Sequence, residues 1–412
     1  MATITWTGYA PAVAQVNTIT VAGTPANGQV YAVVINGKTI SYTATGVDTN
    51  TTIATALQAL LAVSTAPPEF LEVTWANPSA GVITGTAVTA GVPFTNTSSA
   101  TGTGTLVTVI TTASAGPNDV STAGNYDSGT LPTNGDTLYF TNNTSSALYG
   151  LSALSGVTLA ALYVDASYSG FIGLPQVNAA GYWEYRPQYL QVGATLFTCG
   201  DGIGGGSGRV KVNFGSVATT ANVLGTGSPA EQTMPALILL GTSGSNVLNV
   251  YQGSVGTAMD PGNTSTWATI KTGWETNQNT DVTLYIGLGV TLTNTYQYGG
   301  TITTFSNLST HVMTAGTLTL LASATPGTIT CDGGTVYWRS TGTMTSGTFR
   351  NSGTTLDCQG DPRARTATNL SVTKGAALLD PTKSITFTNP FATDSLSQPN
   401  SNYGFSYSLQ RS

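Results

Sequence analysis

Charged side chains that could take part in catalysis gather most densely late in the chain. The cluster consists of Asp357, Asp361, Arg363 and Arg365. Glycoside hydrolysis uses a pair of carboxylates, and polysaccharide elimination uses a base beside a cation, so these residue types suit a carbohydrate-active enzyme. The alternative is a set of ion pairs at a loop or a subunit contact. We favour the ion pairs, and we predict no catalytic residue and no enzyme activity.

A second charged pair, Glu184 and Arg186, lies within an aromatic segment. The neighbouring aromatic residues are Tyr182, Trp183, Tyr185 and Tyr189. Aromatic rings can stack against sugar rings, but they more often pack a core or an interface. We expect Glu184 and Arg186 to form a structural ion pair. The sequence leaves open whether the aromatic group binds glycans.

Histidine and cysteine residues form no metal-binding motif. The sole histidine is His311, and Cys199, Cys331 and Cys358 are widely spaced and odd in number, with no CxxC pair. Neither a zinc site nor a disulfide framework follows. We expect buried free thiols, although Cys331 and Cys358 lie in one repeat and could stack. We expect His311 at a turn or strand edge, and we predict no metal and no cofactor.

The glycine-rich segment 200–205 formally fits the GxGxxG pattern of dinucleotide-binding proteins. Such a site requires a helix directly after the glycines, with its N-terminus aimed at the pyrophosphate. Here the following residues, 209–214, read as another strand. We therefore predict a flexible loop, and the segment also lacks the aspartate spacing of calcium-binding repeats.

Composition limits the kinds of partner. The 412 residues are 40% hydrophobic but only 7% charged, whereas ordinary soluble proteins have about 25% charged residues. Threonine, serine, asparagine and glycine must therefore cover most of the surface. With 12 Lys and Arg against 18 Asp and Glu, the net charge is −6 and no basic stripe exists. We expect no direct binding to nucleic acid and no attraction to membrane surfaces.

Targeting signals are not visible in the sequence. Residues 1–6 have no basic start and no apolar run, so we do not expect a signal peptide. The longest apolar run, 235–240, suits a buried strand and falls short of the ~18 residues that a membrane helix requires. We expect synthesis in a cytoplasm, followed by release through lysis or particle assembly.

The elements that position these residues are mostly short strands. In segment 315–360, Gly-Thr pairs open successive strands, and Gly316, Gly334 and Gly353 are separated by 18 and 19 residues. Alternating polar and apolar residues follow each pair, so one face of each strand can be buried. A single repeat cannot bury its apolar face alone, whereas stacked repeats can. We predict a β-solenoid, with a sandwich or barrel as the alternative.

The N-terminal residues 1–111 show a different pattern. Asn36-Gly37 between two apolar runs predicts a hairpin. Ile53, Leu57, Leu60 and Leu61 share one face of a helix that Asp48 or Asn50 can cap and Pro67-Pro68 ends. The sum is a β-β-β-α-β-β docking module in a mainly β chain. We place a linker at 112–124, the solenoid body at 125–379 and a cap or subunit-contact segment at 380–412.

Two stretches resemble known families. The module, with Thr20-Val21-Ala22-Gly23, Ile35-Asn36-Gly37 and its Ala/Leu helix, resembles a module that recurs in structural proteins of tailed bacteriophages. Residues 125–140 resemble the segment that precedes right-handed β-helices in bacterial surface proteins and some phage proteins. Tyr126 stands where that pattern has Trp, and Leu138 where it has Val. In this reading Pro132 and Gly135-Asp136 form a turn into the first strand of the body.

The resemblance implies a virion protein of a bacteriophage. We expect a non-enzymatic structural protein, preferably a capsid decoration protein that forms a homotrimer and contacts other virion proteins such as the major capsid protein. The alternatives are a tail fibre or spike protein and a bacterial surface β-helix adhesin. A polysaccharide-degrading enzyme is less favoured, and it would depend on Asp357 or Asp361.

Overall fold

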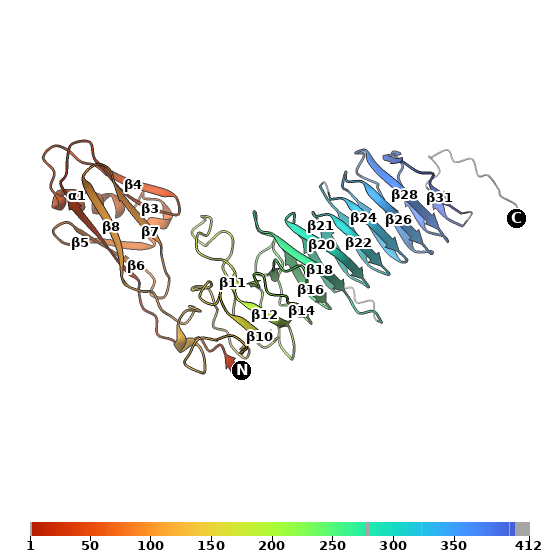
Figure 1. The fold of residues 1–412 in the computed structure, drawn as a ribbon, viewed down its shortest axis with the longest axis horizontal. Helices are drawn as coiled ribbons and strands as arrows, with labels where there is room; N and C mark the ends of the chain where they lie inside the picture. Colours follow the sequence, from red (N-terminus) through yellow and green to blue (C-terminus); the bar gives the residue numbers. More distant parts are fainter. Residues whose placement is uncertain (1, 277–280, 323, 395, 400–412) are drawn as a thin grey trace.

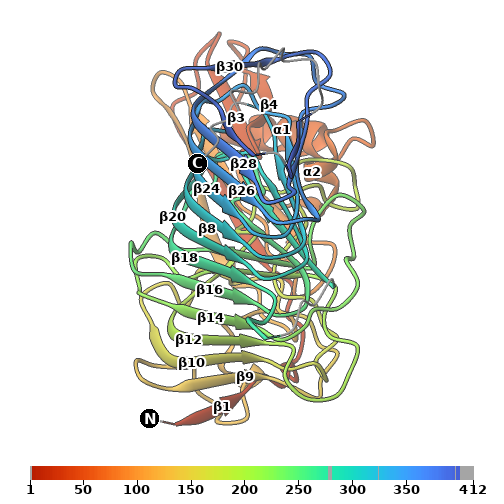
Figure 2. The ribbon, with the colours of Figure 1, turned by 90° about the vertical axis from the view of Figure 1, so that its right-hand side faces the viewer.

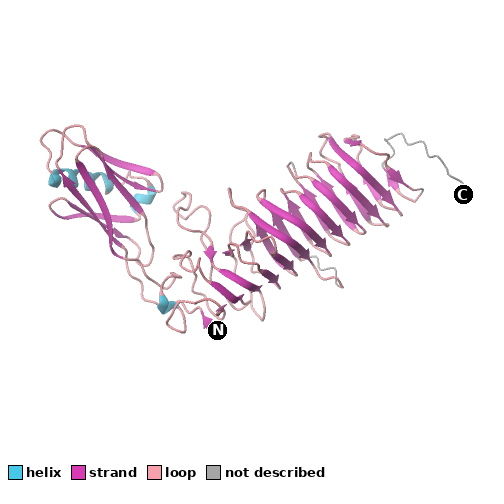
Figure 3. Ribbon diagram, viewed as in Figure 1, coloured by secondary structure: helices cyan, strands magenta, loops and turns pink. Residues whose placement is uncertain are grey.

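A computed structural model describes residues 2–276, 281–322, 324–394 and 396–399. Strands dominate these residues, and the predicted mainly β fold class is confirmed (Figure 3). Two long parallel sheets run through most of the chain, and two small antiparallel sheets lie near its N-terminus. We call residues 16–112 the module, and we call residues 2–12 and 116–399 the body. Figure 1 shows the body as a long arm, with the module attached near the N-terminus.

The longer sheet of the body contains 14 strands within the described residues, and all of its pairings are parallel. Figure 2 shows these strands stacked along the body. Its strands are β1 (Thr3–Thr5), β9 (Thr137–Phe140), β10 (Thr158–Val164), β12 (Gly193–Cys199), β14 (Thr220–Val223), β16 (Val247–Val250), β18 (Ser265–Thr272), β20 (Val290–Gln297), β22 (Leu308–Met313), β24 (Pro326–Cys331), β26 (Met344–Arg350), β28 (Arg365–Thr373), β30 (Ile385–Phe387) and β31 (Ala392–Thr393).

The shorter sheet contains 11 strands within the same residues and is also parallel. From β11 to β30, successive strands alternate between the two sheets, so each strand pairs with the next but one along the chain. Its strands are β11 (Leu190–Gln191), β13 (Val210–Asn213), β15 (Leu237–Leu240), β17 (Gly253–Thr257), β19 (Val282–Ile286), β21 (Thr301–Thr304), β23 (Thr317–Leu320), β25 (Gly334–Trp338), β27 (Thr354–Asp357), β29 (Ala377–Leu379) and β32 (Gln398–Pro399).

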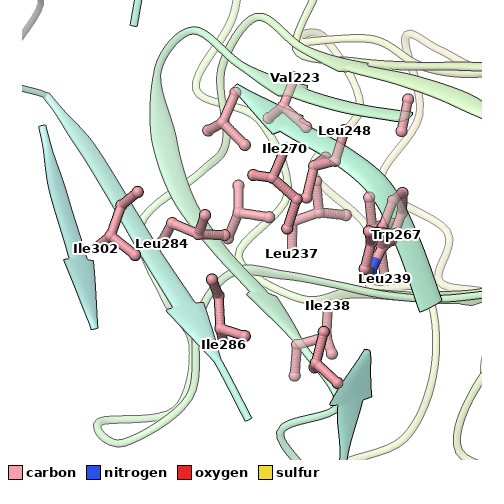
Figure 4. Close-up of a cluster of buried hydrophobic side chains, with 14 of the residues drawn as sticks. Val223, Leu237, Ile238, Leu239, Leu248, Trp267, Ile270, Leu284, Ile286 and Ile302 are labelled. Carbon is pink, nitrogen blue, oxygen red and sulfur yellow. The ribbon is translucent and has the colours of Figure 1, made fainter. Parts of the chain in front are cut away.

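One hydrophobic core fills the space between the two sheets. Leu284 and Ile302 are register partners in the shorter sheet, and Leu248 and Ile270 are partners in the longer one. Side chains of all four meet in the core (Figure 4). Period-2 alternation sends every second side chain inward, and parallel register stacks these apolar residues in rows. Full burial of each such side chain contributes about 1.5–3 kcal/mol.

The module has its own core, separate from that of the body. A four-stranded sheet, β5-β6-β2-β8, and a three-stranded sheet, β4-β3-β7, are both antiparallel, and helix α1 contacts β2, β4, β5 and β6. The elements of the module are β2 (Val16–Gly23), β3 (Val30–Ile35), β4 (Lys38–Thr43), α1 (Asn50–Leu61), α2 (Pro68–Leu71), β5 (Val73–Ser79), β6 (Val82–Ala87), β7 (Asn96–Ala100) and β8 (Gly104–Thr112).

Three local predictions for the module differ from the structure. Thr49 caps α1 in place of Asp48 or Asn50, because its hydroxyl accepts from the Thr52 amide in a reciprocal capping box. Leu60 is 41% exposed, since it lies off the buried face of Ile53, Leu57 and Leu61. Strand β7 was not predicted, because its sequence, Asn-Thr-Ser-Ser-Ala, has no apolar alternation.

The predicted boundary places the start of the module at residue 1, but the first residues belong to the body. Strand β1 pairs with β9, and Trp6 packs against Tyr126 and Phe140, so residues 3–6 cover the first end of the body core. The chain leaves the body near Val13 and returns at Ala115. These two residues form an antiparallel bridge, with Val13 N donating to Ala115 O at 2.7 Å. The module is therefore an insertion in the N-terminal end of the body.

The predicted linker and cap also carry structure. Within 112–124, Val120 is buried in the body core, and a 3-10 turn, η1 (Ala123–Asn125), follows it. The periodicity does not end at 380, because β30 and β31 pair with β28 and β32 pairs with β29. Residues 400–412, the end of the predicted cap or subunit-contact segment, lie outside the described residues. No helix among those described is long and apolar enough to span a membrane.

Candidate functional site

The predicted Asp357–Arg365 cluster divides into two sets of ion pairs. Asp357 pairs with Arg339, whose Nη2 lies 3.0 Å from its Oδ1. Asp361 pairs with Arg363 at 2.7 Å and lies 3.6 Å from Arg365. Hydrogen bonds from Arg363 lower the pKa of the Asp361 carboxyl to about 2. A carboxylate held charged in this way lacks the proton that a general acid must donate.

Arg365 connects separate segments of the chain within this cluster. Its side chain is buried, and its guanidinium donates to the backbone oxygens of Trp338, Asp361 and Arg363 while lying 5.6 Å from the centre of the Trp338 ring. Trp338 ends β25 and Arg365 begins β28, so the contact joins the two sheets at one edge of the core. This geometry matches the predicted structural ion pairs.

The second predicted cluster lies at the junction between the module and the body. Arg186 donates from Nη1 to both carboxylate oxygens of Glu184, at 3.0 and 3.1 Å. Its Nη2 contacts Glu72 of the module, and its Nε donates to the backbone oxygen of Pro93 at 2.7 Å. Tyr182 also donates to Glu72. One guanidinium thus joins a body loop to two separate segments of the module.

The charged groups of this junction are buried, so removing any one of them is costly. Arg186 is 9% exposed and Glu184 is 8% exposed. Burial by itself lowers the pKa of Arg186, but the facing oxygens of Tyr185, Glu184 and Glu72 outweigh it, so the pKa lies above its ordinary value. Burial also raises the pKa of Tyr185 to about 12. Removal of one partner from such a buried pair typically costs about 3–5 kcal/mol.

A third cluster, which sequence reasoning missed, lies beside the junction. Lys211 is on β13 between the inward-facing Val210 and Val212, so its side chain lies on the outer face of the shorter sheet. It is nevertheless only 1% exposed, because loops cover that face. Its Nζ lies 3.3 Å from Asp260 Oδ2, and Tyr189 donates to the same carboxylate. Only the alternation Val-Lys-Val could have signalled an outward lysine.

His311 is placed differently from its prediction. It lies in β22, which pairs with β20 on one side and β24 on the other, and it is fully buried. Within the described part of the chain, neither ring nitrogen has a hydrogen-bond partner. Burial lowers the pKa of His311 to about 3. The turn or strand-edge expectation was wrong because an isolated histidine gives no sign of which face it occupies.

The three cysteines are buried free thiols, as predicted, and the glycine-rich segment lies in a loop. Cys199, Cys331 and Cys358 are free and buried. Burial raises the thiol pKa of Cys199 and Cys358 to about 12 and that of Cys331 to about 11, so all three stay protonated near neutral pH. Segment 200–205 is a loop followed by strand β13. Among the described residues, no group of three or more His, Cys, Asp or Glu side chains is placed to hold a metal ion.

No protein-family model matches the chain, and no curated protein matches it. The geometry of the junction and of the body therefore carries the functional argument.

Proposed function

We propose that this chain is a non-enzymatic structural protein of a phage particle, and specifically a capsid decoration protein. In this proposal the body is a β-solenoid of the right-handed β-helix type that projects from the virion, and the module docks to other virion proteins such as the major capsid protein. Three copies assemble into a homotrimer. The alternation of successive strands between two parallel sheets supports the solenoid.

One observation carries the proposal: the module is held at a defined position on the end of the body. Both chain connections lie side by side at Val13 and Ala115. Arg186 adds a buried tie to Glu72 and to the Pro93 carbonyl. Two connections and a buried ion pair resist rotation better than a single flexible linker does. A fixed angle between the attachment unit and the arm would suit a component that projects from a particle in one set direction.

The charge distribution supports assembly in multiple copies. Only 7% of the residues are charged, and several of the buried charges are already paired within the chain. Burying a further face against another subunit would therefore desolvate few charges. A tail fibre or spike, or a bacterial surface adhesin, would share this property, so location must be tested directly.

Assembly is tested by the native mass of the purified full chain in multi-angle light scattering. The homotrimer predicts a mass near three times 42.0 kDa. A monomer at micromolar concentration would contradict the trimeric decoration protein.

Location is tested by immunogold electron microscopy of particles released from cells that carry this gene. Antibodies against the body should label the head surface of the particles. Labelling confined to tails would favour the fibre or spike, and labelling of the cell surface without particles would favour the adhesin.

A further inference from the structure

A groove with a volume of about 330 Å³, lined by polar and aromatic residues, lies next to the junction on the outer side of the shorter sheet. Segment 183–189 forms one wall, and the turn 260–263 after β17 forms the other. The residues that line it include Trp183, Gln188, Tyr189, Asp260, Pro261 and Asn263. This volume falls at the small end of the range for ligand pockets, which suits one or two monosaccharide units.

A buried acceptor lies at this groove. Asp260 is only 7% exposed, and its Oδ2 accepts from Tyr189 and from Lys211. Its Oδ1 has no hydrogen-bond partner within the part of the chain that the structure describes. A buried carboxylate oxygen left without a donor is costly, by about 1–3 kcal/mol or more. This oxygen is itself shielded from solvent, so a ligand hydroxyl would reach it only if the Asp260 side chain turned towards the groove, and that contact would remove the cost.

An exposed aromatic ring completes the arrangement. Trp183 is 61% exposed, although the residues on either side of it, Tyr182 and Glu184, are 8% exposed. The Trp183 carbonyl accepts from Asn36 of the module at 3.1 Å, and Trp183 forms a bridge with Val177, so the backbone below the ring is fixed. A fixed, solvent-facing indole beside amide and carboxylate groups suits a ligand with one apolar face and several hydroxyls.

The cations near the groove are already engaged. Arg186 donates from Nε, Nη1 and Nη2 to Pro93, Glu184 and Glu72. Lys211 contacts Asp260 and Gln188 and is almost fully buried. A phosphate, sulfate or uronic acid would thus meet the Asp260 carboxylate without a matching positive group. Charge therefore selects a neutral ligand.

We propose that this groove binds a neutral hexose unit of a glycan, with Trp183 stacked on the ring and Asp260, Gln188 and Asn263 contacting its hydroxyls. The proposal does not depend on where the protein resides, because it rests on the groove alone. It also gives the aromatic segment 182–189 a double role: Tyr182 and Arg186 hold the junction, and Trp183 faces the ligand.

The test is ligand-observed NMR and calorimetry on the full chain with the methyl α- and β-glycosides of glucose, galactose, mannose and N-acetylglucosamine. At least one is expected to bind with a dissociation constant on the order of 1 mM, as weak single-site sugar contacts allow. Trp183→Ala should weaken this binding about tenfold through loss of the stacked ring. Asp260→Asn, which keeps an acceptor for Tyr189, should weaken it several-fold.

Trp274→Ala is the matched control. Trp274 is also exposed, at 45%, but it stacks on Tyr251 at 4.0 Å and does not line this groove. Its replacement should leave sugar binding unchanged. Failure of every glycoside to bind the wild-type chain would overturn the proposal. So would binding that survives Trp183→Ala, or binding of glucose 6-phosphate or glucuronic acid in preference to the neutral sugars.

Discussion

Three buried cations of this protein connect segments that are distant in sequence. Arg186 joins the body to the module, Lys211 holds the turn at Asp260, and Arg365 links β28 to β25. Each of these charges is almost fully buried, so each partner must be present to offset the cost of desolvation. The sequence suggested ion pairs for Arg186 and Asp361, because charged residues stand close together there. It could not suggest Lys211–Asp260, whose members are far apart in the chain.

His311 makes the stability of the body depend on pH. Its pKa is about 3 in the folded chain, against about 6.5 when unfolded. Below pH 6.5 the unfolded state therefore binds a proton that the folded state does not, and stability falls as the pH falls from about 6.5 towards 3. His311→Leu removes this group. As the pH falls through this window, the free energy of unfolding should fall less for the variant than for the wild type. The difference between the two should grow by up to about 1.4 kcal/mol per pH unit.

The measurement is urea denaturation of both proteins at several pH values between 7 and about 4. Carboxylates such as Asp48, Asp136 and Asp361, whose pKa values are lowered to about 2, are present in both proteins and cancel in the difference. Denaturation midpoints that shift in parallel across the whole range would show that His311 does not stay neutral in the fold.

The glycines in the turns before strands of the shorter sheet share a backbone angle but differ in the space around them. Gly334 and Gly353 have almost the same backbone angle, with φ of 93° and 91°. A Cβ on Gly334 would lie 2.4 Å from the Gly316 oxygen and 2.6 Å from Met313 Cε, whereas a Cβ on Gly353 would meet nothing within 4 Å. Gly353→Ala therefore tests the backbone angle alone, and Gly334→Ala tests the angle and the contact together.

Both alanine variants should be less stable than the wild type, but by different amounts. We expect Gly353→Ala to cost about 1–2 kcal/mol from the left-handed conformation. Gly334→Ala should cost about 1–3 kcal/mol more, because the preceding turn must move. Thermal and urea denaturation of the two variants measure the difference. Equal losses of stability in the two variants would mean that the backbone near Gly316 moves aside at no cost in free energy.

The repeat in the sequence was a good guide to these turns and a weaker guide to strands elsewhere. Gly316, Gly334 and Gly353 all have positive φ and all lie at the start of shorter-sheet strands. Gly327 and Gly347 lie inside β24 and β26, where no side chain fits against the neighbouring strand or core. Strand β14, Thr-Ala-Asn-Val, was not predicted, because it is too short and polar to show a period without its partners.

The division of the chain into module and body was harder to predict than the fold class. The sequence indicated a change of pattern near residue 111, which agrees with the end of β8 at Thr112. It could not indicate that residues 3–6 belong to the body, because three residues of β1 show no pattern until β9 lies beside them. The junction was equally hidden, since Glu72 and Arg186 belong to separate units.

The insertion predicts that the body folds without the module. Replacing residues 14–114 with two glycines joins Val13 to Ala115, which already form a bridge. We expect this variant to be monodisperse or to keep the assembly state of the full chain, with a β-type circular dichroism spectrum and a cooperative melt.

Deleting residues 1–114 is the comparison, because it also removes β1 and Trp6. That deletion should leave the β9 edge and Phe140 uncovered and cause aggregation. Equal behaviour of the two variants would contradict the capping role of β1.

The buried tie at the junction predicts a fixed angle between the module and the body. Arg186→Met keeps the apolar stem but leaves Glu184 and Glu72 facing each other without a cation. Leaving these charges unpaired costs about 3–5 kcal/mol at the junction. The remaining contacts, such as the hydrogen bond from Asn36 to the Trp183 carbonyl, stabilise the junction by less than this cost. The module should then move about its two connections at Val13 and Ala115 while each core stays folded.

Small-angle X-ray scattering measures this motion as a broader distribution of maximum dimensions for Arg186→Met than for the wild type. Arg350→Met is the matched control, because Arg350 pairs with Asp332 on the surface of the body, where both side chains are more than 30% exposed. That pair is worth about 0–1 kcal/mol and joins no second unit, so its loss should leave the scattering curve unchanged. Adding Glu72→Gln and Glu184→Gln to Arg186→Met removes the unpaired charges and should restore part of the rigidity. If Arg186→Met scatters like the wild type, packing of the loop around Tyr182 and Tyr185, and not the ion pair, fixes the angle.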